Sequence, residues 1–217
     1  MIKTEAVIFD MDGVIFDSER IYLECCIAVG KKYAMNNVEE VCHRCIGTNS
    51  AMTRQILLES CGEDFPVEEF TRDTSGLFWE RYHAEGQLPV KTGTEELLQY
   101  LTEKGIPASI ASSTKTEVVR RQLKDAGLLD YFSRVVGGDQ VTRSKPEPDI
   151  FLKAAEVMQT APENCLVIED SYNGIRAAAA AGMTSIMVPD LLEPNDEMRE
   201  KAWKILPSLT EVKELLG

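Results

Sequence analysis

The sequence has few histidines and no long apolar segment, and both shortages limit what the protein can be. Only two histidines, His43 and His83, occur among the 217 residues. Both lie in a region predicted to be helical, away from the acidic motifs described below, so we expect them to be structural or solvent-facing. The first apolar run, Ala6–Phe9, is too short for a signal peptide or a bilayer span, and no other stretch reaches that length. We therefore expect a cytoplasmic protein without a membrane segment.

Positive charge is also scarce. Lysine and arginine number 23 against 36 aspartates and glutamates, which gives a net charge of −13. An acidic surface of this size disfavours nucleic acid and anionic membranes as partners, so we expect a small-molecule ligand. A phosphorylated ligand would be repelled as well, and its site must carry local positive charge. No exposed apolar stripe stands out, so a monomer is the default expectation.

Cysteine is sparse and unevenly distributed, because five of the six cysteines fall in the first third of the chain. Cys42 and Cys45 form a C-x-x-C pair, but no second pair follows at zinc-finger spacing. In the helical pattern of this region the two cysteines share a face with apolar residues. We therefore expect reduced, partly buried thiols rather than a metal or redox site.

Short apolar runs alternate with helical patterns over most of the chain. The runs predict strands at Ala6–Phe9, Ala108–Ala111, Val135–Gly137, Leu166–Ile168 and Ser185–Val188. The intervening patterns predict helices at Gly93–Lys104, Thr116–Ala126, Pro148–Met158 and Asn173–Ala181, and residues 190–217 predict one or two short helices. Continuous apolar strands that alternate with helices indicate an α/β fold with a doubly wound parallel sheet, a Rossmann-like core covered on both faces.

The block from residue 17 to 88 shows no clear strand. Apolar positions such as Ile21 and Cys25 recur there at helical spacing, and the breaks between them divide the block into four helices. We therefore predict a catalytic α/β core of residues 1–16 and 89–217, with a four-helix domain of residues 17–88 inserted after the first strand.

Acidic residues follow two of the predicted strands at the points where they end. Asp10 and Asp12 follow the first strand, and Glu169 and Asp170 follow the fourth. Ligands in doubly wound folds bind beyond the carboxyl ends of the strands, so these acids should converge. At a separation of about 5 Å and an effective dielectric near 20, each like-charge pair costs about 3 kcal/mol. A divalent cation removes that cost, and oxygen ligands beside an anionic substrate suggest Mg²⁺.

Groups suited to binding phosphate follow the other strands. Ser112 follows the second predicted strand, and Lys145 lies after the third. Ser113 is placed in the same phosphate site, although Ser113, Thr114 and Lys115 could instead only cap the following helix. Lys145 and the metal would together overcome the repulsion of phosphate by this acidic protein.

The two aspartates after the first strand suit the two roles that phosphoryl transfer requires. Asp10, closest to the strand end, can act as the nucleophile and form an aspartyl-phosphate. Asp12 can protonate the leaving oxygen and then activate a water molecule. Gly13 leaves room for the backbone to approach the phosphate. The sequence thus predicts a two-step hydrolysis of a phosphomonoester.

Four motifs, spread over nearly the whole chain, resemble those of the haloacid dehalogenase-like hydrolase superfamily in type and order. They are Asp10-Met11-Asp12-Gly13-Val14, Ser112, Lys145-Pro146 and Glu169-Asp170. The resemblance implies that the nucleophile is Asp10, the general acid and base Asp12, and the phosphate ligands Ser112 and Lys145. It implies that Mg²⁺ is held by Asp10, the main-chain carbonyl of Asp12 and Asp170, with Glu169 helping directly or through water. The inserted helices correspond to that family's helical cap.

Two branches of the superfamily share this layout. One contains phosphatases of sugar phosphates and nucleotide-like monoesters, including pseudouridine-5′-phosphatase, and the other contains sugar phosphomutases of the β-phosphoglucomutase type. Such mutases carry a histidine, a lysine and an arginine where this chain has Tyr22, Ile46 and Ser50. A mutase must grip a second phosphate, so these departures favour the phosphatase. A catalytically silent protein of the same fold is a further alternative, against which the intact motifs argue.

Several cap residues are candidates for reading the leaving group of the substrate. They lie on segments that should face the active site, and they are Glu19, Arg20, Tyr22, Asn49 and Ser50. The sequence does not name the substrate. We expect the cap to open for entry and to close against water, with hinges near residues 14–17 and 86–90.

Overall fold

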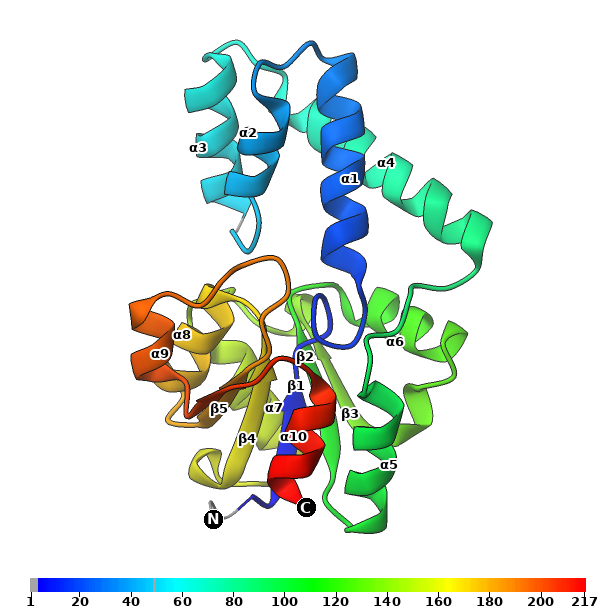
Figure 1. The fold of residues 1–217 in the computed structure, drawn as a ribbon, viewed down its shortest axis with the longest axis vertical. Helices are drawn as coiled ribbons and strands as arrows, with labels where there is room; N and C mark the ends of the chain where they lie inside the picture. The colour runs from blue at the N-terminus through cyan, green and yellow to red at the C-terminus, as the bar shows by residue number, and fades with distance from the viewer. Residues whose placement is uncertain (1–3, 49) are drawn as a thin grey trace. The chain divides into compact units, whose positions relative to one another are not determined.

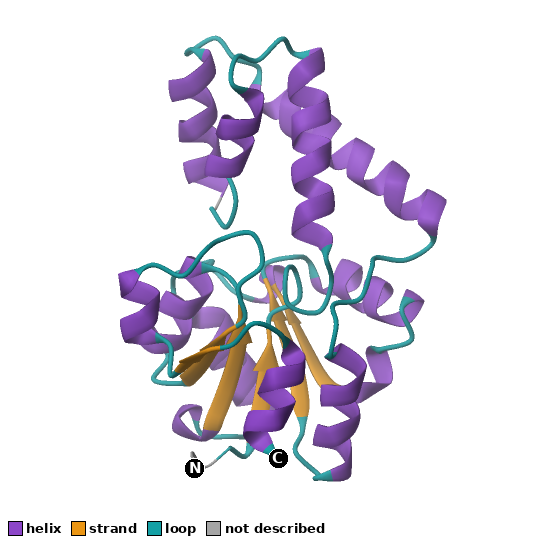
Figure 2. Cartoon of the chain, in the orientation of Figure 1, coloured by secondary structure: helices purple, strands orange, loops and turns teal. Residues whose placement is uncertain are grey.

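The computed structural model describes residues 4–48 and 50–217 of the chain. The chain divides into two compact units, one made of residues up to Asp17 together with Pro89–Gly217 and the other of Ser18–Leu88. The first is an α/β core, and the described elements of the second are helices (Figures 1 and 2). The chain leaves the first unit after Asp17 and returns to it at Pro89. These two residues are neighbours, because the N–H of Asp17 donates to the carbonyl of Pro89 at 2.9 Å.

The core is built on a parallel sheet. The described residues form six strands in the order β3-β2-β1-β4-β5-β6. Their bounds are Ala6–Phe9 (β1), Ala108–Ser112 (β2), Phe132–Gly137 (β3), Cys165–Glu169 (β4), Thr184–Met187 (β5) and Lys204–Ile205 (β6). All neighbouring pairs are parallel, which confirms the predicted fold class. The order reverses beside β1, since β2 and β3 lie on one side of it and β4 to β6 on the other. This reversal is where doubly wound folds bind ligands.

Helices cover both faces of the sheet. They are α5 (Thr94–Glu103), α6 (Thr116–Asp125), α7 (Asp149–Met158), α8 (Tyr172–Ala180), α9 (Asp196–Lys201) and α10 (Leu209–Leu216). Three 3-10 turns lie among them: η1 (Leu129–Tyr131), η2 (Gly138–Gln140) and η3 (Pro162–Asn164). Right-handed crossovers put α5 and α6 on one face and α7 and α8 on the other, and α10 packs against α5. Burial from both sides explains why every residue of β1 and β4 is apolar or buried.

The cap has a core of its own. Its helices are α1 (Ser18–Lys32), α2 (Val38–Arg44), α3 (Ser50–Cys61) and α4 (Val67–Glu85). They enclose a cluster of buried side chains that includes Val29, Leu57 and Phe70. Positive φ angles at Ala34 and Asn37 turn the chain between α1 and α2. Within the described parts of the chain, no helix combines the length and apolarity that crossing a membrane requires.

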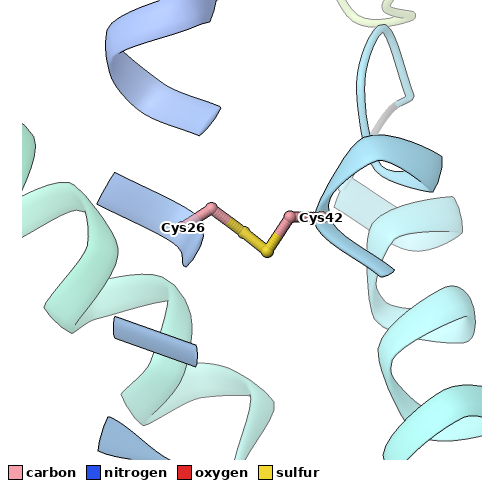
Figure 3. Close-up of a disulfide and its surroundings, with 2 residues drawn as sticks. All are labelled: Cys26 and Cys42. Carbon is pink, nitrogen blue, oxygen red and sulfur yellow. A yellow bond between two sulfur atoms is a disulfide. The ribbon is translucent and has the colours of Figure 1, made fainter. Parts of the chain in front are cut away.

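A disulfide joins Cys26 of α1 to Cys42 of α2, as Figure 3 shows. This finding corrects the expectation that Cys42 is a reduced thiol, whereas Cys45 is free as expected. The free cysteines are Cys25, Cys45, Cys61 and Cys165. Both bonded residues are buried, with 6% and 2% of their surface exposed. The spacing pattern placed Cys42 correctly on an apolar face, but it could not show that Cys26 lies opposite, because that depends on how α1 and α2 pack.

Candidate active site

Three buried carboxylates meet at the carboxyl ends of β1 and β4. Asp10 follows β1, Glu169 is the last residue of β4, and Asp170 comes next. The strands are neighbours in a register that pairs Phe9 with Ile168, and the N–H of Asp10 donates to the carbonyl of Ile168 at 2.9 Å. Carboxylate oxygens of the three acids all lie within 4.8 Å of one another. The register of two central strands therefore assembles this cluster from residues about 160 positions apart.

Lys145 supplies the positive charge that the acidic cluster needs. It is buried, and its ammonium donates to Oδ1 of Asp10 and, at 2.8 Å, to Oε1 of Glu169. Burial disfavours the charged form, but the two carboxylates outweigh it and raise the pKa of Lys145 above its ordinary value. Burial raises the pKa of Asp10 to about 7, although the Lys145 ammonium pulls it down. The site thus contains a buried ammonium held between two buried carboxylates.

Two glycines make room for the acids. Gly13 has a φ of +80°, and a Cβ there would lie 2.3 Å from Oδ2 of Asp170. A Cβ at Gly174 would lie 1.7 Å from Oε1 of Glu169. Glu169 is also fixed by the N–H of Ser171, which donates to its Oε2 at 2.6 Å. A side chain at either glycine would displace a carboxylate of the cluster.

The side chain of Asp12 is held by hydroxyls that follow β2. Its Oδ2 accepts hydrogen bonds from Oγ1 of Thr114 at 3.1 Å and from Oγ of Ser112 at 3.4 Å. The N–H of Thr114 in turn donates to the Ser112 hydroxyl at 3.0 Å, and the carbonyl of Thr114 accepts from the N–H of Gly138. Thr114 was not among the predicted site residues. In the sequence, only its position after a predicted strand pointed to a place in the site.

Ser113 stands apart from this group, because its residue is exposed. The helix that follows is not capped by Ser113, Thr114 or Lys115. Asp139 accepts instead from the N–H of Thr116 at 2.6 Å and from its hydroxyl at 2.8 Å. Hydrogen bonds from Thr116 hold the pKa of Asp139 below its usual value. The side chain that caps α6 is therefore that of Asp139, from the segment after β3.

The candidate substrate residues of the cap are more exposed than those of the core. Glu19 is half-buried and Arg20 exposed at the start of α1, while the exposed Ser50 begins α3. Tyr22 is 40% exposed, and its ring lies 6.0 Å from that of Phe78 in α4. Asn49 lies outside the described residues. Both histidines are exposed.

The donor set of the cluster fits a hard divalent cation. Asp10, Glu169 and Asp170 offer carboxylate oxygens within 4.8 Å of one another. Three carboxylates and one ammonium carry a formal charge of −3 + 1 = −2, which a divalent ion would balance. Oxygen ligands of this kind suit Mg²⁺. Asp12 is not part of this cluster, and its Oδ2 accepts hydrogen bonds from Ser112 and Thr114.

Comparisons with known proteins agree with this geometry. A family model described as haloacid dehalogenase-like hydrolase matches residues 7–188. A phosphorylated carbohydrates phosphatase from Thermotoga maritima is 34% identical over 188 residues, covering 84% of this chain and 83% of that protein. A probable pseudouridine-5′-phosphatase from Drosophila melanogaster is 31% identical over 222 residues, covering 97% and 92%. The crystal structure of a putative β-phosphoglucomutase from T. maritima is 30% identical, with a TM-score of 0.78 and 98% of each chain covered.

Proposed function

Because the chain belongs to the haloacid dehalogenase-like hydrolases, we propose that it is a Mg²⁺-dependent phosphatase that acts through an aspartyl-phosphate on Asp10. The observation that carries the proposal is the buried contact of Lys145 with Asp10 and Glu169 at the point where the strand order reverses. A buried lysine between two acids is costly to maintain for stability alone, since apolar packing would serve as well. Binding of a phosphoryl group during its transfer would account for a lysine at this position.

The reaction proceeds in two displacements at phosphorus. In the first, a carboxylate oxygen of Asp10 bonds to phosphorus while the bond to the leaving oxygen breaks, and Asp12 gives that oxygen its proton. In the second, ionised Asp12 takes a proton from water, the resulting hydroxide bonds to phosphorus, and the bond to Asp10 breaks. Inorganic phosphate leaves, and both aspartates return to their starting states.

The remaining residues position the reacting groups. Lys145 and Ser112 bind the phosphoryl oxygens, and Ser113, the exposed residue directly after β2, is a further candidate for this role. Thr114 holds Asp12 through its hydroxyl. Asp10, the carbonyl of Asp12 and Asp170 would hold Mg²⁺, with Glu169 helping directly or through water. When bound, the ion neutralises negative charge on the phosphoryl oxygens.

We propose a small phosphorylated metabolite as the substrate, either a sugar phosphate or a nucleotide-like monoester. The names of the relatives from T. maritima and D. melanogaster point to these two classes. The net charge of −13 disfavours nucleic acid and anionic membranes as partners. We propose a cytoplasmic, monomeric enzyme. The cap residues Glu19, Arg20, Tyr22, Asn49 and Ser50 are the candidates for reading the leaving group.

A sugar phosphomutase is the second candidate, and the likeness to a putative β-phosphoglucomutase favours it. A mutase returns the phosphoryl group to a sugar and must hold a second phosphate. Tyr22, Ile46 and Ser50 replace the three cationic or basic groups that would do so. All three replacements are uncharged side chains, which cannot form an ion pair with a second phosphate, so we rank hydrolysis first.

Phosphate release from a panel of sugar phosphates, nucleotides and pseudouridine 5′-phosphate tests the proposal. We expect Mg²⁺-dependent release from one or a few compounds, abolished by a chelator and by Asp10→Asn. Conversion of β-glucose 1-phosphate to its isomer, with a requirement for a sugar bisphosphate and little free phosphate, would identify the mutase. No turnover of any phosphoester would refute both activities.

A further inference from the structure

Helices α1 and α2 of the cap lie antiparallel and are joined by two successive contacts. Nearest the turn, a Cβ on Gly30 would lie 2.3 Å from Cγ2 of Val38, so the two backbones approach closely there. One helical turn further along, Cys26 is bonded to Cys42 (Figure 3). The spacing of four residues on each helix keeps these partners on one face.

This contact line leads from the disulfide to the candidate substrate residues of the cap. Tyr22 is four residues before Cys26, and Glu19 and Arg20 begin the same helix. On the other side, Cys42 is followed by the segment that leads to Ser50 at the start of α3. The disulfide is thus the covalent tie between the two arms of the cap on which these residues lie.

We propose that Cys26 and Cys42 form a reversible thiol–disulfide site that fixes the spacing of the two substrate-reading arms of the cap. The proposal rests on the phosphatase function above for its effect on catalysis, but the bond itself is independent of that function. A small dithiol is the class of reductant that it would accept, because both bonded residues are buried and a small molecule reaches them more readily than a protein does.

Helix α2 depends on such a tie more than the other cap helices do. It has only seven residues, and its N-cap residue Asn37, in the left-handed region, makes no side-chain capping bond. A helix this short is marginal in water without tertiary contacts. Opening the disulfide would leave α2 held by apolar packing and by the exposed bonds of Arg44 to Ser60 and Glu59 of α3, and would let the segment after it shift.

The remaining thiols are poor partners for exchange with this bond. Burial raises the pKa of Cys45 to about 11, and it also raises the pKa of Cys25 and of Cys61. These residues are therefore thiols at neutral pH, whereas exchange requires a thiolate. Cys45 is the candidate for internal exchange that the C-x-x-C spacing provides, yet its protonation keeps the bond between Cys26 and Cys42. An external reductant is needed to open it.

Reduction of the disulfide by a dithiol is a two-electron exchange. A thiolate of the dithiol attacks one sulfur of the protein disulfide and releases the other as a thiolate that takes up a proton. The second thiol of the reductant, after losing its proton, displaces the protein sulfur from the mixed disulfide. The protein gains two thiols, and the reductant becomes a cyclic disulfide.

The experiment compares the full-length enzyme after oxidation by a small disulfide and after reduction by dithiothreitol. Free thiols are alkylated in denaturant and counted by intact mass. We expect four alkylated cysteines in the oxidised protein and the remaining two only after reduction. Six alkylated cysteines after oxidation would overturn the proposal.

The catalytic effect is measured with the preferred substrate and with p-nitrophenyl phosphate, a small activated ester that needs little recognition by the cap. We expect reduction to raise KM for the preferred substrate about three- to tenfold, the effect of ordering one or two side chains on binding. Turnover of p-nitrophenyl phosphate should change less than about twofold, because the core is untouched. An unchanged KM in a protein whose thiol count does change would refute the control of the cap.

Three variants test whether the change in KM comes from the disulfide. Cys26→Ala and Cys42→Ala should both behave like the reduced enzyme and stop responding to dithiothreitol. Cys25→Ala, a change of the neighbouring buried free thiol, should keep the response. The comparison of oxidised and reduced wild type decides the proposal even where a variant fails to fold. Absence of all phosphatase activity would refute the proposed function, and the thiol count would then decide whether the bond forms.

Discussion

The core and the cap differ in how they hold their candidate functional residues. In the core, Asp10, Lys145 and Glu169 are buried and bonded to one another. In the cap, Arg20 and Tyr22 are exposed on a helix that packs within its own unit. Buried, interlinked charges tolerate little change, whereas exposed side chains can vary without disturbing the fold. We infer that the chemistry of this protein is fixed by the sheet and that its specificity can be altered separately.

The sharpest test of this division is Asp10→Asn in the core. The amide keeps the shape of the carboxylate but cannot form the acyl-phosphate, so we expect phosphate release to fall by about 10⁴-fold or more. Circular dichroism should show an unchanged fold. Asp130→Asn, at an exposed core position, is the matched control and should retain activity. Residual activity of Asp10→Asn within tenfold of wild type would mean that another group is the nucleophile.

Lys145→Met should have the next largest effect, on both activity and stability. It removes the cation from the buried carboxylates of Asp10 and Glu169, and breaking a buried pair costs about 3–5 kcal/mol. We expect urea unfolding in the presence of a chelator to show this loss, and Mg²⁺ to recover part of it by balancing the same charge.

A matched control for that change is Lys153→Met on α7, whose lysine forms only a partly exposed pair with Glu156. Exposed pairs contribute about 0–1 kcal/mol, so its unfolding midpoint should barely move. Equal losses for the two variants would contradict the special role of the buried lysine.

Thr114→Val tests a smaller effect within the same region. The valine fills the same volume but cannot donate to Asp12, so the acid loses the 3.1 Å hydrogen bond that orients it. We expect kcat to fall about tenfold with KM nearly unchanged, since the loss concerns a proton-transferring group. Thr114→Ser keeps the hydroxyl and should restore most of the rate. A valine variant with wild-type kcat would show that Asp12 is oriented without this residue.

The core site could be predicted from the sequence because its geometry follows from strand order. Asp10 and Glu169 follow apolar runs, and parallel strands put their carboxyl ends at one edge. The role of Thr114 could not be foreseen, because it depends on how the turn after β2 folds back toward Asp12. Strand β6 was missed for a simpler reason: Lys204 and Ile205 are too few residues to form a recognisable apolar run.

The cap was less predictable in detail. Helical spacing showed four helices but not which faces meet. The pairing of Cys26 with Cys42 depends on the turn through Ala34 and Asn37, whose positive φ angles set α2 against α1. Neither residue type signals a left-handed conformation as strongly as glycine does. Helical spacing alone therefore does not predict which residues of a bundle of short helices are in contact.

Arg20→Ala is the mildest of these changes, and it tests whether specificity resides in the cap. Arg20 pairs with Glu24 at 3.5 Å on the surface, and such pairs contribute little to stability, so the melting temperature should change by less than about 2 °C. If Arg20 reads the leaving group, KM for the preferred substrate rises about three- to tenfold, while turnover of p-nitrophenyl phosphate stays the same. Arg72→Ala, an exposed arginine of α4, is the control. An equal loss of activity with both substrates would mean that Arg20 takes part in the reaction. It would contradict the division of roles between core and cap.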